Sequence, residues 1–172
     1  MLIDCHSHLA NYNEDEIAGI ISRSQKSGVS YIFSAGTDIE NSKKTIDLAN
    51  SNDAIYCGVG IHPNRVTEYI QDIDFYKLEQ LANSSSKVIT MSEMGMDYMP
   101  NAPQRKIQEN VFIAQITIAK KLKLPIIWHS QIPEINSFGN HINTINILNN
   151  EHAYTVGGIM HYFQAHYKTA TK

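Results

Sequence analysis

Short apolar segments alternate with longer amphipathic ones along the whole of this 172-residue chain. Six of the short segments have the length and the Ile, Val and Tyr content of buried strands. They span residues 1–9, 29–37, 54–63, 87–98, 124–130 and 155–163. Strands that alternate with helices in this way are typical of βα units around a parallel sheet. We therefore expect an α/β fold.

The segments between the strands carry helix signals. Asp38 occupies the position of an N-cap for the helix that follows the second strand. A longer helix is expected from about residue 103 to 123, and Pro125 would end it before the fifth strand. The segment 133–150 is less periodic and contains Gly139, so its helix is predicted from weaker signals.

The number of βα units limits how the sheet can close. The chain shows no linker and no internal repeat, and we expect residues 1–172 to form a single domain. A closed (β/α)8 barrel, the TIM-barrel fold, typically needs about 250 residues. Six units with nine residues after the last strand predict an incomplete TIM barrel that lacks its final strands. Such a sheet would leave edge strands with unpaired backbone groups.

Composition narrows the class of protein. A net charge of −3 and a pI near 6.2 predict no basic surface for binding nucleic acid, so such a function must come from a specific site. No apolar run approaches the roughly 20 residues of a membrane span, and no signal segment opens the chain. With only two cysteines, a disulfide framework is not expected, and we predict a cytoplasmic protein. Cys5 is expected to be a small buried apolar residue.

Side chains that can bind a metal lie where the predicted strands end. His6 and His8 close the first strand, and their two-residue spacing predicts that both point to the same side. Glu93 follows the fourth strand, His129 the fifth and His161 the sixth. Each residue alone is more often an ordinary surface or core group. Because active sites of TIM barrels form at the C-terminal ends of the strands, we expect all five to converge.

This set of side chains has the chemistry of a dinuclear metal site. Imidazoles and one bridging carboxylate can hold two divalent ions. Such ions lower the pKa of a shared water and stabilise negative charge on the attacked phosphoryl or carbonyl group, which favours hydrolysis. The nitrogen and oxygen ligands would accept Zn, Mn, Co or Mg, and the sequence does not select among them.

The sequence resembles the TatD-like DNases, a family of amidohydrolase-like metal-dependent hydrolases, along its whole length. The motifs that carry the resemblance are residues 4–9 (DCHSHL), 36–37 (GT), 60–63 (GIHP), 93–98 (EMGMDY), 124–129 (LPIIWH) and 161–163 (HYF), with Gln108, Phe112 and Gln115. The resemblance implies a TIM barrel, two divalent metal ions and metal-dependent hydrolysis of phosphodiester bonds in DNA.

The resemblance also assigns roles by position. His6 and His8 would bind one ion, and His129 with His161 would bind the other. Glu93 would bridge the two ions and serve as the catalytic carboxylate.

Other positions are less sharply defined by the resemblance. His62 would line the pocket, or would serve only as a turn residue. Asp97 and Tyr98 would orient ligands, with helix capping equally open for Asp97. Ser92 stands where the family usually has glycine, and Gln131 where it often has an arginine suited to phosphate. The family's aspartate from the last strand has no counterpart before the end of the sequence.

Three interpretations of the activity remain open. The chain is an active hydrolase on DNA whose missing strands and aspartate come from a second polypeptide, either another chain or a swapped copy. Alternatively, it is an inactive remnant that binds metal weakly and aggregates through its open edges. The third interpretation keeps the hydrolase chemistry and changes the substrate to a different ester or an amide.

Overall fold

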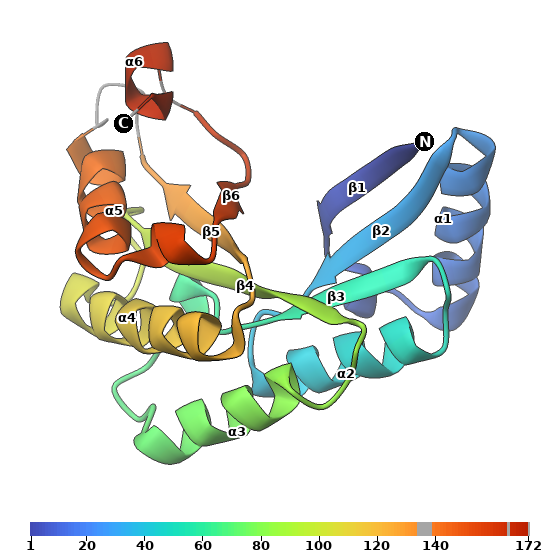
Figure 1. The fold of residues 1–172 in the computed structure, drawn as a ribbon, viewed down its shortest axis with the longest axis horizontal. Coiled ribbons are helices and arrows are strands. Elements are labelled where there is room, and N and C mark those ends of the chain that lie inside the picture. The colour runs from blue at the N-terminus through green and yellow to red at the C-terminus, as the bar shows by residue number, and fades with distance from the viewer. Residues whose placement is uncertain (134–138, 165, 172) are drawn as a thin grey trace.

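The computed structural model describes residues 1–133, 139–164 and 166–171. Six strands form one sheet in the order β1-β2-β3-β4-β5-β6, and every neighbouring pair is parallel. The strands are β1 (Leu2–Ser7), β2 (Val29–Ala35), β3 (Ile55–Val59), β4 (Val88–Asp97), β5 (Ile126–Gln131) and β6 (Gly158–Met160). The sheet curves into a half-barrel, which confirms the predicted α/β fold of incomplete TIM-barrel type (Figure 1).

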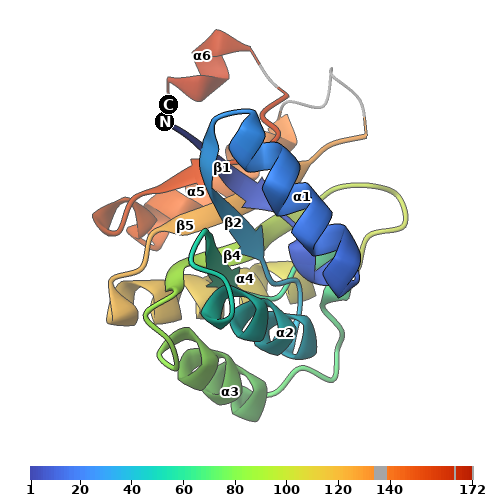
Figure 2. The ribbon, with the colours of Figure 1, turned by 90° about the vertical axis from the view of Figure 1, so that its right-hand side faces the viewer.

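Helices cover the outer side of the curved sheet, except the short α6, which follows β6 and lies apart from that side (Figure 1). They are α1 (Glu14–Lys26), α2 (Ile39–Asn50), α3 (Asp72–Ala82), α4 (Arg105–Leu122), α5 (Gly139–Asn150) and α6 (Tyr167–Ala170), with short 3₁₀ turns η1 (Leu9–Asn11), η2 (Pro63–Arg65) and η4 (Ala153–Thr155). Figure 1 shows α2, α3 and α4 along the convex side, and Figure 2 shows α1 in front of β2. Among the described residues, no helix is both long and apolar enough to span a membrane.

The helix signals of the sequence agree with the structure. Asp38 is the N-cap of α2, and its Oδ1 accepts a hydrogen bond from the backbone N–H of Asn41 at 2.8 Å. The long helix α4 ends at a left-handed residue, Lys123, two positions before Pro125. The helix predicted within 133–150 is found as α5, and residues 134–138 of that segment lie outside the described residues.

The hydrophobic core lies between the sheet and the helices. Phe112 and Ile116 of α4 and Met91 and Met94 of β4 are completely buried and belong to one cluster. Burying such a side chain contributes about 1.5–3 kcal/mol, so α4 fixes the central strand β4 firmly. This matters for function because β4 carries the carboxylate described below.

The expectation for Cys5 was wrong. Cys5 is exposed, whereas Cys57 of β3 is completely buried. The reason is that β1 is an edge strand, paired in the described part of the chain with β2 alone, so its side chains are poorly covered. Burial raises the pKa of Cys57 to about 12.

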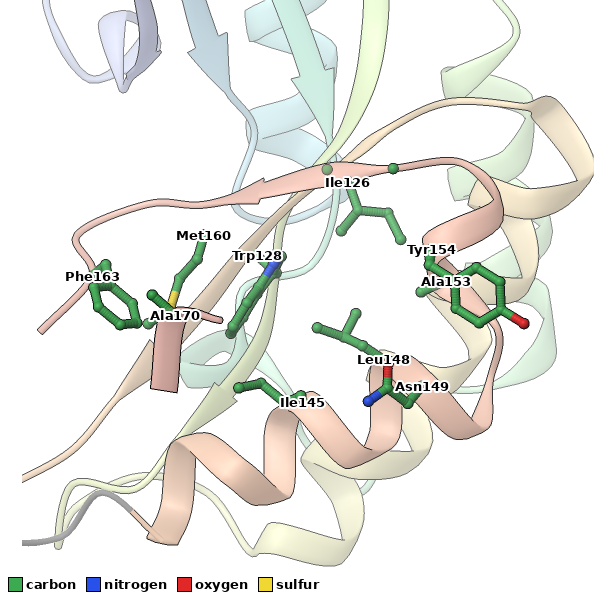
Figure 3. A pocket seen from close by; sticks show the side chains of 12 residues that line it. Ile126, Trp128, Ile145, Leu148, Asn149, Ala153, Tyr154, Met160, Phe163 and Ala170 are labelled. Carbon is green, nitrogen blue, oxygen red and sulfur yellow. The ribbon is translucent and has the colours of Figure 1, made fainter. Parts of the chain in front are cut away.

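Both edges of the sheet carry exposed apolar side chains. Leu2 on β1 is 60% exposed and Ile159 on β6 is 49% exposed. Next to β6, a groove of about 490 Å³ opens between β5, β6 and α5 (Figure 3). Its apolar lining includes Trp128, Leu148 and Met160. Apolar, unpaired strand edges favour association with other strands.

We expect the 172-residue chain to self-associate through these edges, and Ile159→Lys to weaken the association about tenfold because it places a charge on β6. Sedimentation velocity over a range of protein concentrations measures this. Tyr76→Lys is the control, since Tyr76 is 59% exposed on α3, away from both edges. Equal association of the two variants would contradict the prediction.

Candidate metal centre

One buried carboxylate lies at the centre of the mouth formed by the strand ends. Glu93 of β4 is only 2% exposed. On one side, His6 Nε2 and His8 Nε2 each lie 3.4 Å from Glu93 Oε2. His8 follows β1 rather than belonging to it, yet both imidazoles point toward the same carboxylate, as their spacing predicted.

The other carboxylate oxygen faces imidazoles from the opposite half of the sheet. His129 Nδ1 lies 2.9 Å from Glu93 Oε1, and His161 Nε2 is in contact with the same oxygen. His62, which follows β3, places its Nε2 3.6 Å from Oε1. All five residues predicted from the sequence therefore meet at one point, and His62 joins them.

The curvature of the sheet brings its two edges together at this mouth. His6 comes from β1 and His161 directly follows β6, the first and last strands in the sheet order. Their rings nevertheless stack, with centroids 4.1 Å apart and planes 17° from parallel. The half-barrel is thus curled enough to form a compact site from the described residues.

The donor atoms fit divalent metal ions. Two groups each bring their ligand atoms within 4.8 Å of one another, namely His6, His8 and Glu93, and His62, Glu93 and His129. The Nε2 of His6, 3.4 Å from Glu93 Oε2, is buried without a hydrogen bond to any described residue. A buried polar nitrogen without a partner is unfavourable, and a metal ion would satisfy it.

The outer contacts of two histidines define which nitrogen carries the proton. His8 Nδ1 lies 3.3 Å from the carbonyl of Ala35, so it donates and leaves the Nε2 lone pair facing Glu93. His62 Nδ1 instead accepts a hydrogen bond from the backbone N–H of Asn64 at 3.0 Å. The neutral ring of His62 therefore carries its proton on Nε2, which suits a hydrogen-bond donor in the pocket rather than a ligand.

Asp97 lies on the far side of His129 from Glu93. Its Oδ2 is 3.5 Å from His129 Nε2 and accepts a hydrogen bond from Asn64 Nδ2 at 2.7 Å. A carboxylate in this position favours the proton on Nε2 and leaves the Nδ1 lone pair toward the cluster. The hydroxyl of Tyr98 hydrogen bonds Thr144 of α5 at 2.9 Å, so its interaction is with that helix.

The cluster strongly perturbs the ionisation of its members. Burial by itself raises the pKa of Glu93, but hydrogen bonds from the imidazoles, led by His129 and His161, hold that pKa far below its usual range. Burial likewise lowers the pKa of His129, but the carboxylates of Asp97 and Glu93 more than offset this and raise the pKa to about 9. Glu93 is therefore always ionised, and protons compete with a metal for His129.

Two buried glutamines of α4 hold the strand ends that carry the site. Gln108 accepts from the backbone N–H of Asp97 at 2.7 Å and donates to the carbonyl of the same residue at 3.0 Å. Gln115 makes the same pair of bonds with Ile61, at 2.7 and 3.0 Å. The two residues are seven positions apart and so share one helix face. The motif that contains both glutamines in the sequence does not by itself predict this role.

Glycines allow the close backbone approaches at the site. Gly95 has a φ of 144°, and a Cβ there would lie 2.1 Å from the carbonyl oxygen of His129. A Cβ at Gly58 would lie 2.3 Å from Ser92 Oγ. Gly58 therefore leaves the space that the buried hydroxyl of Ser92 occupies, which explains how serine is tolerated directly before Glu93.

Comparison with known sequences identifies the family of this chain. The sequence model of the family described as TatD related DNase matches residues 3–172. The chain belongs to this family. Among its curated relatives in the TatD related DNase family is the uncharacterized metal-dependent hydrolase YabD of Bacillus subtilis, 32% identical over 95% of this chain and 61% of YabD. The deoxyribonuclease Tat-D of Schizosaccharomyces pombe is 31% identical over 72% of this chain and 43% of its own length.

A solved structure supports the same assignment. The crystal structure of YjjV, a TatD homologue from Escherichia coli, superposes with a TM-score of 0.86 at 25% identity, over 99% of this chain and 63% of YjjV. This chain thus spans about three-fifths of the length of YabD and YjjV and less than half of the length of the Schizosaccharomyces pombe relative.

We expect metal binding to release protons. At pH 7.5 His129 is protonated in the metal-free chain, because its pKa is raised from the ordinary 6.5 to about 9 and so lies above that pH. A metal requires the neutral ring. Titration calorimetry in buffers of different ionisation enthalpy should show about one proton released per chain, and affinity should rise with pH toward 9. His129→Gln should lose this release, and His152→Gln, which alters an exposed histidine, should keep it.

The same shift predicts how stability depends on pH without metal. A raised pKa in the folded state contributes stability that is complete below about pH 6.5 and is lost as pH rises through about 9. The melting temperature of the metal-free chain should therefore fall over this interval more in the native chain than in His129→Gln. Identical pH profiles would contradict the assigned contacts of His129.

Asp97→Asn should weaken metal binding about 10- to 100-fold, because it removes the charge that orients His129 while keeping the side-chain shape. Competition with a fluorescent chelator measures the affinity. Asp53→Asn is the matched control, since Asp53 is exposed in the loop before β3. An affinity of the Asp97 variant equal to that of the control would show that Asp97 does not act on His129.

Proposed function

We propose that this chain is a divalent-metal-dependent hydrolase that cleaves phosphodiester bonds in DNA. The observation that carries the proposal is the buried Glu93 of β4, surrounded by imidazoles from the ends of four other strands. Membership of the TatD related DNase family supports DNA as the substrate. A relative from Pectobacterium atrosepticum, 31% identical over 64% of this chain and 42% of its own length, is named a 3'-5' ssDNA/RNA exonuclease.

We propose two ions, each of them Mg, Mn, Zn or Co. His6 and His8 would hold one, His129 and His161 the other, and Glu93, with one oxygen facing each pair, would bridge them. Divalent ions bound there would act as Lewis acids and lower the pKa of water toward neutrality. The absence of a thiolate near the cluster is consistent with these metals, because both cysteines lie elsewhere in β1 and β3.

The protein's own groups would supply orientation and hydrogen bonds. Asp97 would hold His129 in the tautomer that faces the ions. His62 would donate its Nε2 proton to an oxygen of the substrate phosphate, because its Nδ1 is already occupied by Asn64. Glu93 would keep its negative charge throughout, since its pKa lies far below the working pH.

Further features of the chain support three proposals about its context. A continuous core from η1 to η4 suggests that residues 1–172 act as one domain. The exposed apolar edges suggest a partner polypeptide that adds strands to β1 and β6. The free thiols of Cys5 and Cys57 are consistent with a cytoplasmic location.

Cleavage of a labelled DNA oligonucleotide in the presence of Mn or Mg tests the function. Glu93→Gln should lower the rate about 100-fold or more, which corresponds to about 2.7 kcal/mol of barrier, and a chelator should abolish cleavage. Glu68→Gln, at an exposed position, is the control. Turnover of simple esters or amides but not of DNA would favour the alternative substrate class. Absence of cleavage, alone and with a polypeptide that completes the sheet, would contradict the proposal.

A further inference from the structure

The metal centre opens into a hollow of about 430 Å³, a volume typical of small-ligand pockets. Glu93, His8 and His62 form its inner end. From there it extends outward between η2, which carries Asn64 and Arg65, and the start of α2. A chain of nucleotides with one phosphate at the metal centre would place neighbouring groups in this hollow.

Arg65 is the one permanent cation among the described residues that line the hollow. It is exposed and forms no ion pair with the carboxylates of the described chain. Of the two acidic residues in the lining, Glu93 is surrounded by the imidazoles of the metal centre, and Asp38 is engaged as the N-cap of α2 through its Oδ1. The guanidinium of Arg65 therefore remains available, and its planar donors match the oxygens of a phosphate group.

The turn that carries Arg65 is firmly attached to the metal centre. The backbone N–H of Arg65 donates to the carbonyl of His62 at 2.8 Å, and Val66 directly after it is buried. The side chain of Asn64 is bonded to Asp97 at 2.7 Å. The backbone of Arg65 thus has a defined position relative to Glu93, and the flexible side chain can reach along the hollow.

We propose that Arg65 recognises a phosphate of the nucleic acid next to the one held at the metal centre, and so determines specificity for a polynucleotide over a single phosphodiester. The inference rests on the proposed function and names the residue that distinguishes its substrate class. A monophosphodiester has no second phosphate, so its binding gains nothing from Arg65. A longer nucleic acid has this phosphate and binds more tightly because of Arg65.

The test compares Arg65→Gln with Arg23→Gln, which removes the same charge from an exposed position on α1. Binding of a fluorescent single-stranded oligonucleotide to the metal-loaded chain is followed by anisotropy at several salt concentrations. Arg65→Gln should bind about three- to fivefold more weakly, with a log–log salt slope smaller by about 0.7, the value for one lost phosphate contact to a single strand. Arg65→Lys should restore the slope.

Kinetics separate recognition from chemistry. KM for the oligonucleotide should rise in Arg65→Gln while kcat/KM for bis(p-nitrophenyl) phosphate stays at the native value. Equal salt slopes and KM values in the Arg65 and Arg23 variants would overturn the inference and leave the proposed function standing. A native chain that hydrolyses the monophosphodiester but neither binds nor cleaves the oligonucleotide would overturn both assignments to DNA while retaining metal-dependent hydrolysis.

Discussion

The structure of the site depends on the interaction of one buried carboxylate with the imidazoles that surround it. An ionised carboxylate with 2% exposure would be strongly unfavourable without partners. Glu93 has partners on both oxygens, with His6 and His8 at one and His129 and His161 at the other. In the metal-free chain, protons on the imidazoles supply the positive charge opposite the Glu93 carboxylate. Divalent ions would replace these protons as the counter-charge.

The curvature of the sheet makes this encounter possible. Each histidine comes from a different point of the parallel sheet, and only a curled sheet brings β1 and β6 to one mouth. The stacked rings of His6 and His161, 4.1 Å apart, are the clearest sign of it. The buried face of α4 packs against the central strand β4 and so fixes the strand that carries Glu93.

Much of this arrangement was predictable from the sequence. The six strands and the convergence of Glu93, His129 and His161 follow from apolar runs that end in polar residues, since the ends of parallel strands share one edge. The exposure of Cys5 was not predictable, because the alternation of side chains does not reveal whether anything covers an edge strand. The sequence also could not show which ring nitrogen of His62 carries the proton, because this depends on the backbone N–H of Asn64 that donates to Nδ1 in the folded chain.

The hydrogen bonds that the side-chain amides of Gln108 and Gln115 make with the backbone hold the site in place independently of its reactive groups. Both side chains are neutral and fully buried, so acid and salt leave their contacts with Asp97 and Ile61 unchanged. The ring of His129, which faces the Asp97 that Gln108 holds, in contrast has a pKa raised to about 9, so protons compete with a metal ion for it. Acidification would therefore favour the release of a bound ion while the glutamine contacts persist, and a return to higher pH would let the ion bind again without refolding.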